Sequence, residues 1–298
     1  MGDGGTAVRL DADVSSDPGT AVPLPPMRLR LHKDSDDNFR MMAGHLAGVL
    51  YRCGLGDDDA LLDVGCGVGR LAIGLLDATT FRGRYVGFDV SAKHVRWARR
   101  NLRPLSPRFR FRLVDVHNER YNPGGAVTGE AVRFPVRADA FDTACLFSVF
   151  THFDADDIAT YLHELHRVLA PGGRAVVTWF LWDEQRRHDV ETGDYPMLHQ
   201  ADEHVLYADP ERPLYAIAHH SDRMRALIRD AGLEVERIEL GTWAHGPGPE
   251  VQDVVVLRKP VPPAPPWPRR LRDGLRRRLS RVRAAAARRR PGSRPGSA

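Results

Sequence analysis

The chain has 298 residues, of which 42% are hydrophobic, enough for one large domain with a buried core plus tails. It has no run of the roughly 20 apolar residues that a membrane-spanning helix needs, and its first residues lack the apolar core of a signal peptide. The net charge of +4 conceals an asymmetry, because the twelve Arg and one Asp of residues 269–298 carry +11 and leave −7 on residues 1–268. The three cysteines, Cys53, Cys66 and Cys145, have no CxxC spacing, which indicates reduced thiols and favours a cytoplasmic protein.

The N-terminal residues are rich in Gly, Asp and Pro and show no apolar periodicity, so we expect residues 1–35 to be a disordered tail. From Asp36 onward, apolar residues recur at spacings of three and four, which predicts a helix that Gly54 can end. The folded domain is therefore expected to begin at residue 36.

Strands and helices alternate over the next part of the chain. The sequence predicts strands at 60–64, 84–90, 109–116, 142–149 and 174–182, and helices at 70–76, 92–102 and 154–169. Asp154 can cap the last of these helices, and the PGG of residues 171–173 can stop it. The alternation implies parallel βαβ units with right-handed crossovers, which define an α/β fold with a doubly wound, Rossmann-like sheet.

A long polar segment, residues 183–220, then interrupts the alternation. It is too long for a plain connection, so it is either a lid over a substrate or a solvated insertion. A helix at 222–231 and two strands at 234–243 and 251–259 follow it. The short loop between these strands predicts that they pair antiparallel.

The domain is expected to end near residue 259. Six of the nine residues 260–268 are proline, which indicates a stiff linker. The Arg-rich tail, residues 269–298, is either solvated and disordered or a basic amphipathic helix. A helix of that kind can lie on an anionic membrane, here the inner face, as a peripheral contact.

The stretch LLDVGCGVGR, residues 61–70, places three glycines, Gly65, Gly67 and Gly69, between a strand and a helix. Such a turn lets a ligand approach the backbone closely, and the helix N-terminus attracts negative charge. The spacing is GxGxG, with Arg70 where a dinucleotide fingerprint has its third glycine, which disfavours NAD and FAD. The lysine of a phosphate-binding P-loop is also absent from this stretch, which disfavours a nucleotide triphosphate.

Two acids end the next two predicted strands. Asp89 follows Gly69 by 20 residues and is placed to accept both hydroxyls of a ribose. Asp115 ends the third strand and can reach an adenine amine. Because ligands of doubly wound sheets bind at the carboxyl ends of the strands, the pattern predicts a cradle for an adenosine without a pyrophosphate.

With these stretches the chain resembles the class I S-adenosylmethionine-dependent methyltransferases. The resemblance is carried, in the family's order, by LLDVGCGVGRLA, YVGFDVS, FRLVDVHN, FDTACLFSVFTH and HRVLAPGGRAVVTWF. It implies a seven-stranded sheet with the last strand antiparallel, and S-adenosyl-L-methionine as cofactor. It also implies these cofactor-binding residues: Asp63, Gly65, Cys66, Gly67 and Gly69 for the methionine part, Asp89 for the ribose, Asp115 for the adenine edge, Val90 and Val116 against the ring, and Leu146, Phe147 and Ser148 closing the pocket.

Structural alternatives stay open for several of these residues. Asp63 could simply cap the following helix, Asp89 could be a turn residue, and Asp115 could be an ordinary strand end. Cys66 fits a small filler whose backbone amide matters.

A proton acceptor is needed if the methyl group goes to an alcohol or phenol, and histidine suits this near neutral pH. His152 follows the fourth predicted strand, where methyltransferases present residues to the transferred methyl, so it is the candidate general base. Its alternative is a structural role beneath the next helix. No metal is expected, because no acid cluster like that of the metal-dependent catechol enzymes occurs here.

Three function classes remain in view. The first is a small-molecule methyltransferase, with O-methylation of a natural product, sugar or glycolipid, and with Tyr195, Tyr207 and Tyr215 of the polar segment over the acceptor. The second is a nucleic-acid methyltransferase that uses the basic tail, although SVFTHF, residues 148–153, lacks the base-methylation pattern and the body is acidic. The third is a non-catalytic partner subunit that binds the cofactor. The oligomeric state is not indicated.

Overall fold

A computed structural model describes residues 21–30, 33–118, 121–128 and 131–263 of the chain. The expectations for residues 1–20 and for most of the linker and the Arg-rich tail lie outside this part. The compact unit that contains the helices and strands below ends at Pro260. Within the described residues, no helix is long and apolar enough to cross a bilayer.

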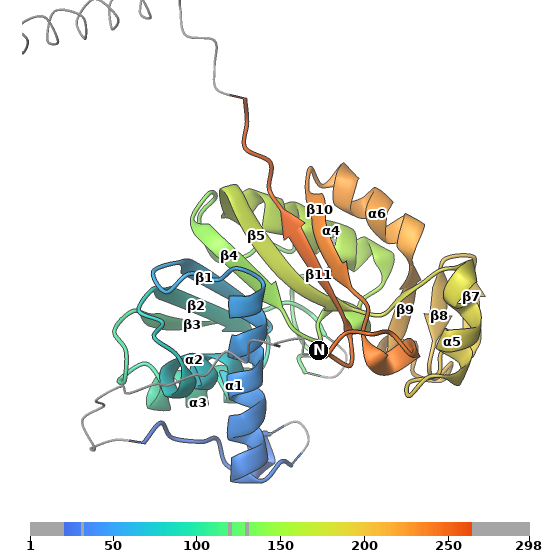
Figure 1. The fold of residues 1–298 in the computed structure, drawn as a ribbon. Coiled ribbons are helices and arrows are strands. Elements are labelled where there is room, and N and C mark those ends of the chain that lie inside the picture. Colours follow the sequence, from blue (N-terminus) through green and yellow to red (C-terminus); the bar gives the residue numbers. More distant parts are fainter. Residues whose placement is uncertain (1–20, 31–32, 119–120, 129–130, 264–298) are drawn as a thin grey trace, which may run out of the picture. The chain divides into compact units, whose positions relative to one another are not determined.

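The main sheet has seven strands in the order β10-β11-β5-β4-β1-β2-β3 (Figure 1). Their bounds are β1 Ala60–Val64, β2 Arg84–Asp89, β3 Phe109–Leu113, β4 Phe141–Leu146, β5 Leu169–Trp179, β10 Glu234–Glu239 and β11 Asp253–Arg258. Strand β11 pairs antiparallel with both β5 and β10, whereas β1 is parallel to β2 and β4. The predicted fold, a Rossmann-like sheet with its last strand antiparallel, is confirmed.

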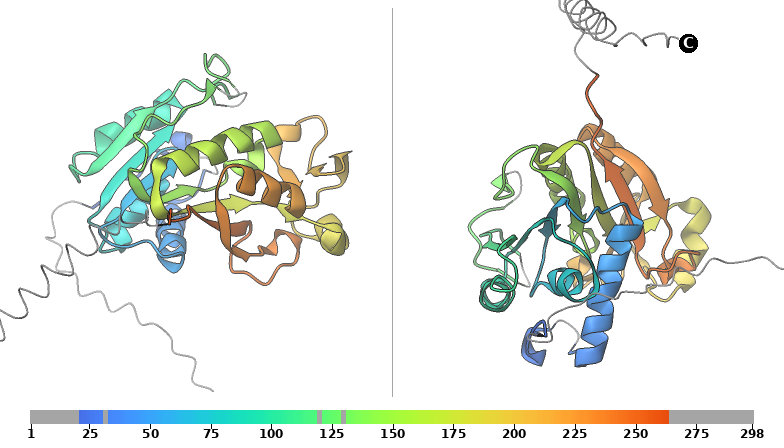
Figure 2. Two further views of the ribbon diagram at one scale, coloured as in Figure 1. Left: turned by 90° about the horizontal axis from the view of Figure 1, so that it is seen from above. Right: turned by 60° about the vertical axis from the view of Figure 1, so that its left-hand side comes forward.

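Helices cover both faces of this sheet (Figure 2). One face packs on α1 Asp36–Arg52, α2 Arg70–Ala78 and α3 Ala92–Asn101, which share a core with side chains such as Leu61 and Tyr85. The other face packs on α4 Ala155–Val168 and α6 Ser221–Asp230, which share a second core with side chains such as Leu62 and Val86. Neighbouring strand residues point to opposite faces, so Leu61 and Leu62 enter different cores. Both faces are buried, which is why the central strands read as continuous apolar runs.

The helix starts follow their capping residues. The Ser35 hydroxyl accepts a hydrogen bond from the Asn38 amide at 3.2 Å and begins α1, while Asp154 accepts from the amides of Asp156 and Asp157 and begins α4. Gly54, with φ of +97°, follows α1 as predicted.

Some expected boundaries differ. Strand β3 ends at Leu113 and β4 at Leu146, each three residues before the expected end. The PGG of residues 171–173 lies inside β5 and does not precede it, because Gly172 donates to the Lys259 carbonyl at 2.9 Å and Lys259 donates to the Gly173 carbonyl at 2.9 Å. These bonds to the chain beyond β11 extend the ladder through the glycines.

Residues 21–30 differ from the expected disorder. They contain a 3₁₀ helix, Met27–Leu29, and bury Val22 in the core beside α1. The Arg30 guanidinium, also buried, donates to the Pro25 carbonyl at 2.8 Å and pairs with Asp36 at the start of α1. The sequence predicts disorder here because the segment is rich in proline, and composition alone does not predict this packing.

The polar segment 183–220 has regular structure of its own. A second sheet has the order β6-β9-β8-β7, made of β6 Leu181–Trp182, β9 Ile217–His220, β8 Val205–Tyr207 and β7 His199–Asp202, and α5 Arg187–Thr192 precedes β7. The sequence suggested that Trp182 belongs to the fifth strand. In the structure it belongs instead to β6 of this second sheet. The strands have two to four residues, too few to show a period of two.

The packing of α1 on α2 leads to a stability prediction. A Cβ on Gly74 in α2 would lie 2.0 Å from the backbone oxygen of Ala43 in α1, whereas a Cβ on Gly48, exposed in α1, would meet no atom within 4 Å. We expect Gly74→Ala to lower the free energy of unfolding by about 3 kcal/mol or to prevent folding. The matched change Gly48→Ala should raise it by about 0.5–1 kcal/mol. Urea denaturation measures both, and equal effects would contradict the close approach.

Candidate functional site

The glycine turn after β1 is closed by hydrogen bonds to its own backbone and to β2. The amides of Gly65 and Cys66 both donate to the Phe88 carbonyl, at 2.9 and 3.0 Å, and the Gly69 amide donates to the Cys66 carbonyl at 2.8 Å. Gly69, at φ of +82°, begins α2, and a Cβ there would lie 2.7 Å from Leu102. A Cβ on Gly67, in contrast, would meet no atom within 4 Å. The turn is therefore packed at Gly69 and faces open space at Gly67.

Asp89, at the carboxyl end of β2, ties this turn to the next helix. Its Oδ2 accepts from the Gly67 amide at 2.8 Å, and its Oδ1 accepts from the Ser91 amide at 2.7 Å. Burial raises the pKa of this carboxyl, and the two amides oppose that shift. Each carboxylate oxygen has more than one lone pair, so both can accept a further hydrogen bond.

Asp63 lies beneath the turn and points into the sheet. Its side chain is buried, its Oδ2 accepts from the Tyr85 hydroxyl at 2.5 Å, and its Oδ1 is 3.6 Å from the Cys145 thiol. Burial raises its pKa to about 6. Helix α2 begins at Gly69 without a side-chain cap among the described residues, so the helix-cap alternative for Asp63 is wrong. Its assignment to the methionine part stays a prediction.

Cys66 is buried and fills the space between the turn and β2, where a Cβ on Gly87 would lie 2.8 Å from the Cys66 Cβ. Its amide donates a hydrogen bond to the Phe88 carbonyl. Burial raises the pKa of its thiol well above the ordinary value. Both observations fit the small filler inferred from the sequence.

The expected adenine side lies beyond β2 and β3. Val90 and Val116 are half-buried, and Asp115 is exposed with its Oδ1 3.2 Å from the Asn122 side-chain amide. The Val114 amide donates to the Asp89 carbonyl at 3.1 Å, so the chain after β3 stays beside the end of β2. The structure thus brings Asp89, Val90 and Asp115 to one edge of the sheet.

The chain after β4 meets the glycine turn. A Cβ on Gly65 would lie 2.9 Å from a Val149 methyl group. Ser148 has a φ of +54°, a strained value for a residue other than glycine. Its amide donates to the Thr178 hydroxyl at 2.7 Å and its hydroxyl donates to the Gln252 side-chain oxygen at 3.1 Å. Sequence reasoning missed Thr178 and Gln252, which come from β5 and from the residue before β11.

His152 ends a short 3₁₀ helix, Phe150–His152, after β4. Its Nδ1 is 3.1 Å from the Leu214 carbonyl oxygen in the second sheet's Pro213–Tyr215 turn. A carbonyl oxygen only accepts, so Nδ1 carries the proton and the neutral ring has its basic lone pair on Nε2. The segment 183–220 therefore reaches the residues beside the expected site and orients this ring.

The two histidines before α6 have structural contacts. His219 is buried, its Nδ1 accepts from the Trp179 indole at 3.0 Å, and burial lowers its pKa to about 4. The His220 ring accepts from the Asp222 amide at 3.2 Å and caps α6. The first contact connects the second sheet to β5 of the main sheet, and the second fixes the start of α6.

Comparisons with known proteins agree with this geometry. The family model of a methyltransferase domain matches residues 61–173. An uncharacterized 37.1 kDa protein in transposon TN4556 of Streptomyces fradiae is 33% identical over 140 residues, 47% of this chain and 34% of that protein. The 2-phytyl-1,4-naphthoquinone methyltransferase of Synechococcus elongatus is 32% identical over 119 residues, 40% of this chain and 45% of that enzyme. The chain thus matches less than half the length of these curated relatives.

Among solved structures, the PH0226 protein of Pyrococcus horikoshii OT3 superimposes with a TM-score of 0.50 at 16% identity, covering 76% of this chain and 92% of that one. This likeness concerns the fold. The family model matched over residues 61–173, the seven-stranded sheet and the glycine turn held by Asp89 agree with the resemblance to the class I S-adenosylmethionine-dependent methyltransferases. S-adenosylmethionine is the cofactor of this class.

The residues present fit that cofactor. Open space lies beside Gly67, where the backbone can approach a ligand. Asp89 next to it offers acceptor oxygens of the kind that bind a ribose diol, and Asp115 offers one further along the same edge. Arg70 begins α2, and it pairs with Asp34 at 3.0 Å.

Burial of Asp63 leads to a pH prediction. Its pKa is about 6 in the folded chain against an ordinary 3.8, so the folded state holds this proton more tightly. The stabilisation is fully present below pH 3.8 and is lost as the pH rises through about 6. Between pH 4 and 7 the wild type should lose up to about 3 kcal/mol of its free energy of unfolding to this titration, and Asp63→Asn should not show this loss. Urea denaturation at pH 4, 5, 6 and 7 measures the free energy of unfolding of both proteins. The same dependence on pH in both would contradict the prediction.

Proposed function

We propose that this chain transfers the methyl group of S-adenosylmethionine to a hydroxyl oxygen of a small-molecule acceptor. The observation that carries the proposal is the Asp89 carboxylate, fixed by the Gly67 and Ser91 amides beside the open face of the glycine turn. This arrangement presents charged acceptor oxygens and exposed backbone at one edge of the sheet, as an adenosine ligand requires.

The cofactor-binding roles follow the positions along this edge. Asp89 accepts the ribose hydroxyls, Asp115 accepts the adenine amine, and Val90 and Val116 pack on the ring. Asp63, Gly65, Cys66, Gly67 and Gly69 hold the methionine part, and the Tyr85 hydroxyl fixes the buried Asp63 carboxylate by donating to it. Phe147 and Ser148 close the site beside the turn, because the residues after β4 contact Gly65.

The acceptor side is formed by the chain after β4 and by the second sheet. Ser148, held by Thr178 and Gln252, and His152, held by Leu214, lie on this side. The segment 183–220 covers the acceptor as a lid. A small-molecule acceptor is supported by the Synechococcus relative, a methyltransferase of 2-phytyl-1,4-naphthoquinone.

S-adenosylmethionine supplies an activated methyl group on its sulfonium. The chain's own contribution is to position the acceptor in line with that group and to remove its proton. His152 Nε2 accepts the hydroxyl proton while Nδ1–H stays bonded to the Leu214 carbonyl, which stabilises the imidazolium that forms. S-adenosylmethionine held by Asp89 and the glycine turn would supply the methyl carbon, which would leave its sulfur for the acceptor oxygen.

The cofactor roles predict the effect of removing the Asp89 charge. Asp89→Asn keeps one acceptor oxygen but loses charge-assisted hydrogen bonds worth about 1.5–3 kcal/mol. We therefore expect affinity for S-adenosylmethionine to fall roughly 10- to 100-fold in calorimetric titration.

The matched control is Asp230→Asn at the exposed end of α6, which should leave this affinity unchanged. A parallel titration with NADH should show no binding. Equal affinities of wild type and Asp89→Asn, or tight NADH binding, would overturn the assignment of this edge.

The proposed base predicts a separate kinetic result. With a hydroxylated aromatic acceptor, we expect His152→Gln to lower kcat by about 10²–10⁴-fold and leave cofactor affinity unchanged. The residual rate should rise with pH, because hydroxide replaces the base. His163→Gln, exposed on α4, is the control. An unchanged kcat and pH profile in His152→Gln would assign His152 a structural role.

A further inference from the structure

A strongly cationic segment of the chain contains α3 and most of β3. Residues 92–112 contain eight Lys or Arg residues and no Asp or Glu. This segment carries +8, so the rest of residues 1–268 carries −15. In this otherwise acidic body, α3 carries four of these cations, Lys93, Arg96, Arg99 and Arg100, on a basic face beside the edge strand β3. Arg110 and Arg112 alternate with the buried Phe109 and Phe111, so they point to the other side of the sheet.

These cations lack carboxylate partners. Within the described residues none of the eight forms an ion pair, whereas Arg82, Arg167 and Arg174 elsewhere in the body each do. Arg99 donates from Nε to the Phe111 carbonyl at 2.8 Å, which fixes its guanidinium beside β3. The Arg96 and Arg100 side chains are exposed. The charge of this face is thus uncompensated by the chain itself.

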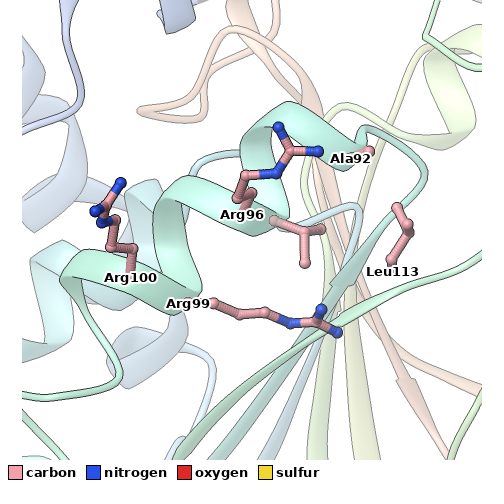
Figure 3. Close-up of a pocket in the computed structure, with 6 residues that line it drawn as sticks. Ala92, Arg96, Arg99, Arg100 and Leu113 are labelled. Atoms are coloured by element: carbon pink, nitrogen blue, oxygen red, sulfur yellow. The ribbon is translucent and has the colours of Figure 1, made fainter.

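A pocket of about 310 Å³ lies within this face. It is lined by Ala92, Val95, Arg96, Arg99, Arg100 and Leu113. Figure 3 shows the three arginines on α3 and Leu113 on the strand across from the helix. Leu113 is 46% exposed, so it gives the pocket an apolar wall that a ligand can contact.

The pocket is separate from the methyl-transfer side. Strands β4, β1, β2 and β3 are consecutive, so about 14 Å separates β3 from β4. The pocket lies next to the expected cofactor edge, because Leu113 pairs with Asp89 in the register of β2 and β3, and it lies on the side away from β4. A ligand in the pocket would therefore be held without being the reacting group.

We propose that this pocket binds the phosphate group of a small phosphorylated ligand whose apolar part packs on Leu113. Guanidinium groups match the geometry of phosphate oxygens and bind them through paired hydrogen bonds. The α3 helix of ten residues spans only about 15 Å. A long polyanion such as RNA would extend past it onto the acidic remainder of the body, which favours a compact ligand.

The test uses the full chain at low salt with two probes, inorganic phosphate and n-hexyl phosphate, followed by amide NMR shifts. S-adenosylhomocysteine is added to occupy the glycine turn. We expect saturable shifts at residues 92–100 and 113, and at least fivefold tighter binding of hexyl phosphate than of phosphate. Arg96→Ala with Arg100→Ala should weaken binding at these residues at least tenfold.

The charge-matched control is Arg223→Ala with Arg225→Ala, exposed on α6, which should leave these shifts within twofold of wild type. Leu113→Ser should remove the advantage of hexyl phosphate and keep phosphate binding. The absence of saturable shifts on α3, or equal weakening in both double variants, would overturn the proposal. So would binding of a single-stranded RNA or of anionic vesicles through Arg96 and Arg100 without binding of hexyl phosphate. None of these results depends on methyl transfer.

Discussion

The Asp89 carboxylate is the interaction on which the site depends, because it joins two segments that would otherwise be independent loops. One oxygen holds the Gly67 amide of the first β–α turn and the other holds the Ser91 amide at the start of α3. The carboxylate is largely buried and its pKa is raised, so these two donors compensate a charge that the surroundings disfavour. The turn and the end of β2 therefore keep one relative position.

A second buried carboxylate joins two segments on the side where we propose that the acceptor binds. Asp253, fully buried at the start of β11, accepts from the Leu181 and Gly241 amides and from the Trp243 indole at 2.7 to 2.9 Å. Burial raises its pKa to about 6 despite these donors. It connects the main sheet to the first strand of the second sheet, whose later turn contacts His152 through Leu214. The orientation of that ring thus depends on residues 60 to 100 positions away in sequence.

Much of the fold follows from local pattern. Apolar strands, glycines and a capping residue such as Asp154 predicted the strands of the main sheet and its helices, because the central strands are buried on both faces and the helices are amphipathic. The same pattern placed Gly67, Asp89 and Asp115 at strand ends, where a doubly wound sheet brings them to one edge. The second sheet escaped prediction because its strands are short and its core, with Phe180, Trp182 and Trp243, is drawn from distant segments.

By itself the sequence determined the α/β alternation, the glycine turn and the spacing to Asp89, since each depends on neighbouring residues or on one strand-to-strand step. Only the tertiary structure decided which partner each side chain has. Asp63 faces Tyr85 and not α2, Ser148 is held by Thr178 and Gln252, and the arginines of α3 meet Leu113 across a pocket. Such contacts depend on the register and order of strands far apart in the chain, and no local pattern encodes them.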